Sequence, residues 1–226
     1  MALIQAVGAA ADATTCTIAS SASGSTIVVM GAFSGGAFSS VTDNQSNTYT
    51  VGTTTNGVAT AWCIGANSGV TTITLVGSSG HRAWGVIEES GLSSLDANPA
   101  ALQNSSANPE LSNTITPAVA TETAFACVGN HSNALSPATW TTNVSGGCTF
   151  STVIGTGLTN SGVDNPGNCG IYLLRGVVTT TATFQASINV GGTNSDVVAI
   201  MSFKQSGGGG TGQPPMYTQR KVLYFI

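Results

Sequence analysis

The sequence predicts an all-β fold, an antiparallel β-sandwich of the jelly-roll kind that is followed by an extended C-terminal tail. Three observations predict it. Apolar and polar residues alternate with a period of two, short runs are apolar on both faces, and Gly, Asn and Ser turn residues recur about every 8–12 residues. A chain of 226 residues can bury roughly 70% of the surface that its unfolded form exposes. One β-sandwich domain over residues 1–205 therefore fits the length.

Several segments read as strands. The segments 26–33, 170–177 and 196–203 are apolar on both faces and are predicted to be central strands. The stretch 93–107 lacks both patterns, and we expect a short helical turn or a long crossover loop there. The clearest alternation lies in 181–190, which places five apolar residues on one face: Ala182, Phe184, Ala186, Ile188 and Val190.

The chain also contains an internal similarity. The same order of similar segments occurs twice: 24–35 with 121–132, 70–75 with 178–184, and 81–90 with 195–205. This order predicts a duplication of two halves with about four strands each, joined by 93–112. The alternative is that strands rich in Thr and Val resemble one another without a common origin.

The composition limits the classes of function. Charged residues make up 6% of the chain, against roughly 25% in an average globular protein. Residues 1–204 hold nine acids and three bases, a net charge of −6, so the body lacks the basic face that nucleic-acid binding needs. A surface with so few charges packs readily against copies of itself or fixed neighbours, because few charges must be desolvated.

The sequence gives no indication of a membrane span or of export. No apolar run approaches about 18 residues, the length that a spanning helix needs. The first residues contain no Lys or Arg before their apolar stretch, unlike a signal peptide. We therefore expect synthesis in the cytoplasm without export, and no contact with a membrane.

The C-terminal tail is predicted to be a connector. A Gly/Pro linker, 206–215, precedes an anchoring tail, 216–226. Gly-rich runs are flexible, whereas the adjacent prolines Pro214 and Pro215 favour an extended chain. The final VLYFI has the composition of a strand and is suited to adding to a neighbour's sheet edge. The residues expected to bind the partner are Tyr217, Val222, Leu223, Tyr224 and Phe225 through apolar contacts, and Arg220 and Lys221 through charge.

No arrangement of residues predicts catalysis. The histidines His81 and His131 occur in no motif that would pair them with a nucleophile. Glu88 and Glu89 are adjacent on a predicted strand, so they point to opposite faces and cannot act together on one substrate atom. We expect this strand end to emerge into solvent, and we expect no enzymatic activity and no cofactor.

The sequence contains only weak indications of binding sites for small ligands. The oxygen-rich loops around Asp43 and Asp164 each offer one carboxylate, which Asx turns explain better than calcium does, so we expect no metal. Trp62 and Trp84 lie in strand-like runs and are expected in the core. Trp140 lies in a polar setting and is the candidate platform for a glycan.

The five cysteines do not form a closed disulfide framework. Cys63 and Cys127 lie in strand-like runs and are expected to be buried thiols. Cys148 and Cys169 lie in Gly-containing loops and are the candidate disulfide pair.

Two segments of the chain have the form of motifs. The first is VTDNQSNTYTVG at 41–52, which is readable as a turn capped by Asp43 or Asn44. The second is VIEESGLSSLDA at 86–97. They resemble the motifs of a β-sandwich module common in phage virion proteins of the decoration and fibre type and in some bacterial surface proteins. The matching positions of the second motif are Glu88, Ser90, Gly91, Leu92, Leu95 and Asp96. The resemblance covers 24–205 and implies a sandwich used as a repeated building block. It implies no catalytic residues and does not extend to the tail.

We therefore expect a non-enzymatic virion structural protein, made in the host cytoplasm. It would be a capsid decoration (cement) protein or a head or tail fibre component, and it would bind other virion proteins and copies of itself. One alternative is a carbohydrate-binding module for receptor recognition, centred on Trp140. Another is an extracellular filament or adhesin subunit at the cell surface.

Overall fold

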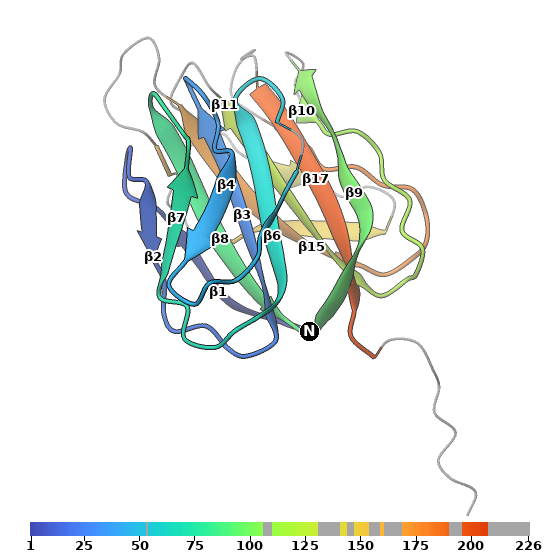
Figure 1. The fold of residues 1–226 in the computed structure, drawn as a ribbon. Helices are drawn as coiled ribbons and strands as arrows, with labels where there is room; N and C mark the ends of the chain where they lie inside the picture. Colours follow the sequence, from blue (N-terminus) through green and yellow to red (C-terminus); the bar gives the residue numbers. More distant parts are fainter. Residues whose placement is uncertain are drawn as a thin grey trace, which may run out of the picture.

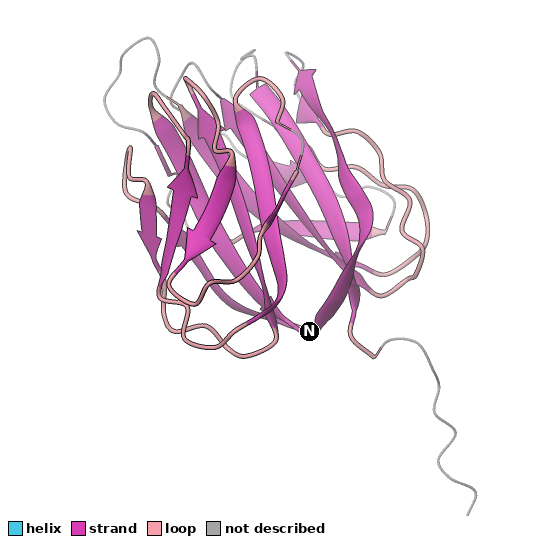
Figure 2. Cartoon of the chain, viewed as in Figure 1, coloured by secondary structure: helices cyan, strands magenta, loops and turns pink. Residues whose placement is uncertain are grey.

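The structure, a computed structural model, consists of β-strands and their connections. It describes residues 1–52, 54–105, 110–130, 141–143, 147–153, 159–160, 169–189 and 196–207. In these ranges every regular element is a strand and every strand pairing is antiparallel (Figure 2). The predicted all-β sandwich class is thereby confirmed.

The strands fall into two halves along the chain. The first half contains β1 (Ala2–Gly8), β2 (Thr15–Thr17), β3 (Ser25–Phe33), β4 (Ser40–Asp43), β5 (Thr50–Val51), β6 (Val58–Ala66), β7 (Thr72–Val76) and β8 (Arg82–Ser90). The second half contains β9 (Leu92–Ser105), β10 (Glu110–Leu111), β11 (Glu122–Asn130), β12 (Thr141–Asn143), β13 (Cys148–Thr152), β14 (Thr159–Asn160), β15 (Gly170–Val178), β16 (Ser187–Asn189) and β17 (Asp196–Gln205).

These strands form four sheets, which we number by their position in the stack. Sheet 1 has the order β2-β7-β4, and sheet 2 has the order β1-β8-β3-β6-β5. Sheet 3 has the order β13-β15-β11-β17-β9, with β14 also paired to β15, and sheet 4 has the order β10-β16-β12. Figure 1 shows the two halves side by side, with β2, β7 and β4 at one side of the molecule and β9 and β17 toward the other.

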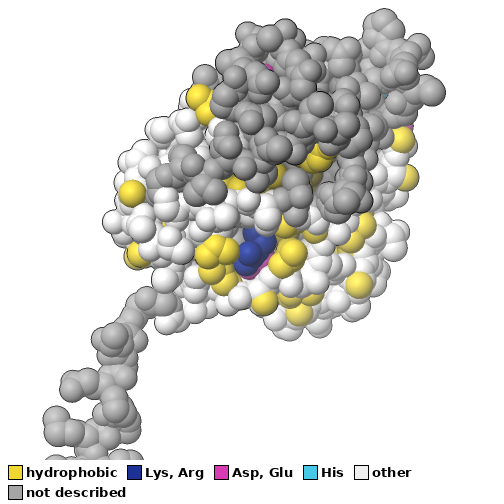
Figure 3. Space-filling view, turned by 180° about the vertical axis from the view of Figure 1, so that it is seen from behind, with side chains coloured by type: hydrophobic (Ala, Val, Ile, Leu, Met, Phe, Trp, Pro, Cys, Tyr) yellow, Lys and Arg dark blue, Asp and Glu magenta, His cyan; other side chains and the backbone are white. Residues whose placement is uncertain are grey.

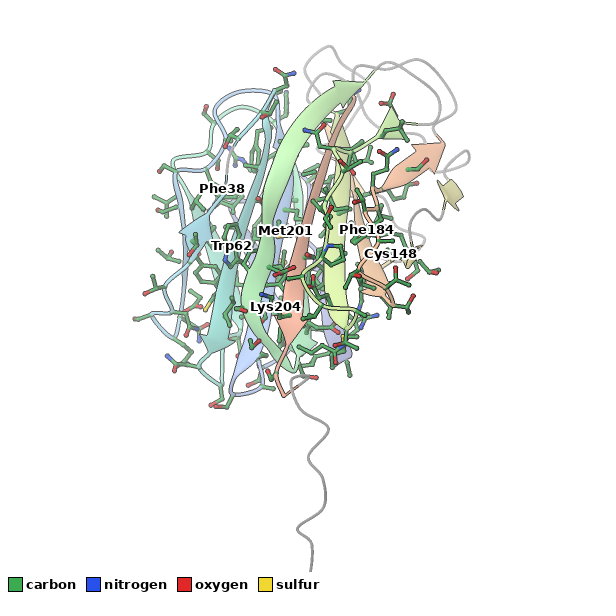
Figure 4. The ribbon with its side chains drawn as sticks, turned by 90° about the vertical axis from the view of Figure 1, so that its right-hand side faces the viewer. Phe38, Trp62, Cys148, Phe184, Met201 and Lys204 are labelled. Carbon is green, nitrogen blue, oxygen red and sulfur yellow. The ribbon has the colours of Figure 1, made fainter. Side chains whose placement is uncertain are left out.

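Three apolar cores lie between successive sheets. Phe38 belongs to the core of sheets 1 and 2, whereas Trp62 and Met201 belong to the core of sheets 2 and 3. Phe184 and Cys148 belong to the core on the outer side of sheet 3. Figure 4 shows these residues in the same succession across the molecule. Sheets 2 and 3 are thus the inner sheets, each covered on both faces.

The double covering explains the segments that are apolar on both faces. All nine residues of β3 are buried, and so are all nine of β11. Each fully buried Val, Ile or Phe side chain contributes roughly 1.5–3 kcal/mol. The prediction that 26–33, 170–177 and 196–203 form central strands is confirmed, since β3, β15 and β17 all lie inside the inner sheets.

The strand orders of the two halves correspond. The succession β1-β8-β3-β6 in sheet 2 matches β9-β17-β11-β15 in sheet 3, and β2-β7-β4 matches β10-β16-β12. The register corresponds too. Val29 of β3 lies opposite Val86 of β8, and Ala126 of β11 lies opposite Ile200 of β17. Two of the three similar segment pairs, 24–35 with 121–132 and 81–90 with 195–205, align in this register.

The third segment pair does not correspond. The strand at the place of β7 is β16 (Ser187–Asn189), whereas 70–75 resembles 178–184 in sequence. Residues 179–186 contain bends and one isolated bridge, between Phe184 and Ile115. The predicted strand over 181–190 is therefore shorter than expected. Phe184 and Ala186 are buried as the alternation predicted, whereas Ala182 is exposed.

The expectation of a helical turn or loop over 93–107 is wrong, because most of this stretch belongs to β9. β9 lies at the edge of sheet 3, and its pairing with β17 contains several register shifts. Proline within a sheet is confined to such edges and irregularities, which accounts for Pro99 inside a strand. An edge strand is paired on one side only, so it tolerates polar residues and proline. The sequence of β9 therefore did not look like that of a strand.

Candidate functional site

Several predicted site residues lie outside the part of the chain that the structure describes. They are the tail residues Tyr217, Arg220, Lys221, Val222, Leu223, Tyr224 and Phe225, the candidate glycan platform Trp140, His131 and Asp164. The predictions for the tail and for glycan binding therefore remain predictions.

The candidate disulfide pair is not brought together. Cys148 is buried in the core on the outer side of sheet 3, whereas Cys169 is buried in the core between sheets 2 and 3. Both residues are thiols in the structure. A strand layer separates the two clusters, so these side chains do not face each other.

The buried thiols predicted at Cys63 and Cys127 are confirmed. Burial raises the pKa of the Cys127 thiol to about 12, and it raises the pKa of Cys148 to about 12 as well. The thiolate is the reactive form of cysteine, so these residues act as small apolar core side chains.

An ion pair joins the two inner sheets. Arg175 of β15 donates from Nε to Glu89 Oε2 at 2.8 Å and from Nη2 to Oε1 at 2.6 Å. The Glu89 side chain is 0% exposed and that of Arg175 is 16% exposed. The hydrogen bond with Glu89 raises the pKa of Arg175 above its ordinary value. Such bidentate geometry is the arrangement in which a buried pair offsets its desolvation best.

The neighbouring Glu88 serves the opposite face of β8. Its Oε2 accepts from Gln5 Nε2 at 2.5 Å, and its Oε1 accepts from the backbone N–H of Ala22 at 2.8 Å. The prediction that Glu88 and Glu89 point to opposite faces is confirmed by these partners. The expectation that they emerge into solvent is wrong, since both are 0% exposed. Sheet 3 covers the Glu89 face of β8, and the Gln5 side chain and the loop before β3 enclose Glu88 on the other face.

A second polar cluster lies where β9, β11 and β17 meet. Lys204 Nζ lies 2.7 Å from Asp96 Oδ1, while Asp96 Oδ2 accepts from the backbone N–H of Ala118 at 2.6 Å. Glu122 Oε1 accepts from the backbone N–H of Val119 at 3.3 Å. Asp96 belongs to the L-D-A motif, so the motif position is explained by a contact that holds the loop before β11.

The pKa values of the two carboxyl groups in this cluster shift in opposite directions. Burial alone would raise the pKa of Asp96, but hydrogen bonds with Lys204, Ala118 and Glu122 bring it below 3.8. Burial and the hydrogen bond with Asp96 raise the pKa of Glu122 above 4.5. Asp96 is therefore the carboxylate that pairs with Lys204, and Glu122 is the group that retains its proton more tightly.

The first motif forms a capped turn, as predicted. Asp43 Oδ1 accepts from the backbone N–H groups of Gln45 at 2.8 Å and Asn47 at 3.2 Å, and Oδ2 accepts from the Tyr49 hydroxyl at 2.9 Å. Burial would raise the pKa of Asp43, but these hydrogen bonds, with that of the Asn47 side chain, lower it below 3.8. The carboxylate is fully used by the turn, which leaves it unsuited to a cation.

His81, Trp62 and Trp84 are further residues that the sequence singled out and the structure describes. His81 Nδ1 lies 3.1 Å from Asp12 Oδ2 on the surface. Trp62 and Trp84 are buried, as predicted.

Within the described ranges no group of three or more His, Cys, Asp or Glu side chains could hold a metal ion. The same ranges contain no helix long and apolar enough to cross a membrane.

The exposed large apolar side chains gather mainly at one place. Met1, Leu3 and Ile4 at the start of the chain are 41%, 40% and 41% exposed, and Val177 of β15 is 37% exposed. We call these four residues the β1 patch. Thr123 Oγ1 contacts Met1 Sδ at 2.6 Å, and Thr123 lies opposite Val177 in sheet 3. The patch therefore spans the junction of sheets 2 and 3.

Figure 3 shows basic atoms beside acidic atoms in a hollow between hydrophobic side chains on one face of the molecule. The β1 patch adjoins such a pair, because Leu3 lies opposite Glu89 and Glu89 binds Arg175. Sequence reasoning missed this surface, because the start of β1 was read only as a poor signal peptide.

No family model matches this chain, and comparison with curated proteins and with solved structures found no match.

Proposed function

We propose that this chain is a non-enzymatic structural protein of a virion, either a capsid decoration (cement) protein or a head or tail fibre component. The observation that carries the proposal is the β1 patch, an apolar surface on a body with very few charges. Large exposed apolar patches on soluble proteins are typical of interaction sites.

The use of the charged groups supports the same proposal. Glu89, Glu88 and Asp96 hold sheets and loops in place through the contacts above. Asp43 is committed to its turn. With these charges engaged internally, the described surface carries few free charges, so a neighbour can cover it at little desolvation cost.

The architecture suits such a role as well. Three successive cores make a thick body whose two inner sheets are covered on both faces, and interiors packed in this way resist deformation. A body of this kind keeps its shape while its surface and its tail make contacts. Its partners would be other virion proteins and copies of itself, and its location the virion.

We also propose that the body arose by duplication of one half. The matching strand orders and the shared register of β3–β8 and β11–β17 support this proposal. The pair 70–75 and 178–184 does not contribute to it, because those segments occupy different places.

The experiment that tests the function is a deletion of 211–226. Particles released from cells that make the protein would be purified, and the amount of this chain in them measured by immunoblot against the full-length protein. We expect a folded body that is lost from the particles. The control replaces 211–226 by a Gly/Ser segment of equal length, which keeps the length and removes the chemistry. Unchanged incorporation of the deletion variant would refute the connector role.

A further inference from the structure

We propose that the β1 edge receives the tail segment 222–226 of a second copy of this chain, which adds to sheet 2 as a strand. This inference rests on the proposed function and names the surface that the tail would bind. It is argued from the edge, from the exit point of the chain and from the chemistry of the segment.

β1 is an open edge. In the part of the chain that the structure describes, β1 pairs only with β8, so its other side presents unpaired backbone groups. Edges that proteins protect usually carry charges or proline. The start of β1 instead exposes Leu3 and Ile4, at 40% and 41%. A strand that pairs here would cover both the backbone groups and the apolar side chains.

The geometry of β1 limits the added strand to a short one. The register with β8 shifts between Leu3 and Gln5, so Ile4 is a bulged residue. Bulges interrupt regular pairing. A five-residue segment such as 222–226 fits an edge of this kind better than a long strand would.

The chain leaves the body beside this edge. After β17, the backbone N–H of Ser206 donates to the carbonyl of Gly91 at 2.7 Å. Gly91 lies so close to the first residue that a Cβ on it would be 3.1 Å from Met1 Cα. Figure 1 shows the N-terminus and the end of β17 at the same end of the molecule. The last described residues, Ser206 and Gly207, therefore lie near the β1 patch.

The chemistry of the segment complements the patch. Residues 222–226 are Val, Leu, Tyr, Phe and Ile, which are all strand-favouring or apolar types. Arg220 and Lys221 directly precede them, whereas residues 1–204 carry a net charge of −6. The charge difference favours approach of the tail to a body.

The length of the connection favours a second copy over the same copy. A strand that pairs beside its own exit point needs a connection of about 2–5 residues. Residues 208–221 intervene here and include Pro214 and Pro215, which stiffen the chain. Fully extended, this connection spans about 45 Å at about 3.3 Å per residue, enough to reach an adjacent body. Contacts of this head-to-tail type close into rings or continue as filaments.

Cross-linking in full-length chains tests the proposal. An Ile4→Cys variant is mixed with a Tyr224→Cys variant and treated with a short bismaleimide. The five native thiols are buried and compete little. We expect a product with the mass of two chains. The double variant should give the same intermolecular product. Its cross-linking within one chain would overturn the proposal, and so would the absence of any product.

A second measurement does not depend on cysteine chemistry. Ile4→Lys places a charge on the edge, which blocks strand addition. We expect self-association of the full chain, measured by sedimentation velocity, to weaken at least tenfold. Val76→Lys is the matched control, since Val76 is 42% exposed and lies at the end of β7 in sheet 1. Thermal unfolding would verify that both variants are folded, and equal weakening in both would overturn the proposal.

The two proposals can fail separately. If the deletion of 211–226 abolishes incorporation into particles but no cross-link forms, the tail binds a different protein and only this inference fails. If cross-links form but the deletion variant is still incorporated normally, the connector role in the virion fails.

Discussion

The two halves of the molecule place different side chains at corresponding positions of their inner sheets. In the first half Glu89 lies opposite Thr26 of the central strand β3. In the second half Phe203 lies opposite Thr123 of the central strand β11. A carboxylate thus stands in one half where an aromatic ring stands in the other.

The partners of these side chains differ in the same way. Trp62 lies opposite Val28 in the first half, and Arg175 lies opposite Phe125 in the second. Trp62 packs edge-to-face on Phe203, with ring centroids 6.4 Å apart and planes at 75°, whereas Arg175 forms the ion pair described above. Of two equivalent contacts between the inner sheets, one is aromatic and the other is ionic.

This difference makes the halves complementary instead of identical. If two first halves packed on each other in this arrangement, Glu89 would meet Trp62 and remain a buried, unpaired charge. If two second halves did so, Arg175 would meet Phe203. Unpaired buried charges are strongly unfavourable, so the ion pair selects the packing of a first half on a second half. Specificity of this kind arises from penalties on the wrong pairing.

The largest expected effect follows from removing one side of the ion pair. Arg175→Met leaves Glu89 buried without its partner, and we expect the free energy of unfolding to fall by about 3–5 kcal/mol. Urea unfolding followed by tryptophan fluorescence would measure it.

The control for this change removes both charges. The double variant Arg175→Met with Glu89→Leu replaces the ionic contact by an apolar one. We expect it to recover most of the free energy of unfolding that the single variant loses. A double variant as unstable as the single one would show that the loss came from packing and not from the unpaired carboxylate.

An intermediate effect is expected at Gly129, where β11 packs closely against β3 and β6. Gly129 of β11 corresponds to Ala32 of β3, and a Cβ on Gly129 would lie 2.8 Å from Val58 Cγ2 and 3.0 Å from Ala32 Cβ. Gly129→Ala should therefore cost about 1–3 kcal/mol through overpacking, as measured by urea unfolding. In a Val58→Ala background the same change should cost less, because the clashing methyl group is gone. An equal cost in both backgrounds would argue against a steric cause.

The smallest effect concerns the carboxyl groups that hold the loop before each central strand. Because the pKa of Glu122 is raised in the folded state, its contribution to stability is full below pH 4.5 and is lost as the pH rises through the raised value. Glu122→Gln stays neutral at every pH. We expect the free energy of unfolding to rise by less than about 1 kcal/mol at pH 7. This rise should disappear below about pH 4, and urea unfolding measured at a series of pH values would test it.

The corresponding change in the first half should have the opposite sign. Glu88→Gln would place an amide N–H group against the side-chain amide of Gln5, which now donates to the carboxylate. We expect the free energy of unfolding to fall by about 1 kcal/mol at pH 7. A gain in both halves would mean that the two carboxyl groups act alike.

The central strands could be predicted from the sequence because burial on both faces leaves a continuous apolar run, as in β3 and β17. The number of sheet layers could not be predicted, since the same apolar runs also suit the core of a two-sheet sandwich. The ion pair was missed because its partners, Glu89 and Arg175, are 86 residues apart and belong to different halves. Two adjacent glutamates at a strand end look like solvent-facing residues until the covering sheet is known.

The turn at 41–49 shows the opposite case. The hydrogen bonds of Asp43 run to residues that are close in the sequence, such as Gln45 and Asn47, so local chemistry was sufficient to predict this cap. Those of the Asn44 side chain run to residues 69–72, which the local sequence does not indicate. The edge strand β9 was missed because its pairing with β17 is irregular and its sequence is polar. Predictability here follows the sequence distance of the contacts that stabilise each element.

The central core has a consequence for synthesis on the ribosome. The first half emerges with β3, β6 and β8 complete, but one face of its inner sheet has no cover until β11, β15 and β17 have also been made. During this interval the uncovered face of sheet 2 is kept partly hydrated by three polar side chains, Thr26, Thr60 and Glu89. All three are fully buried in the finished protein. The same groups that cost desolvation at the end of folding would thus protect the nascent chain from aggregation before its second half arrives.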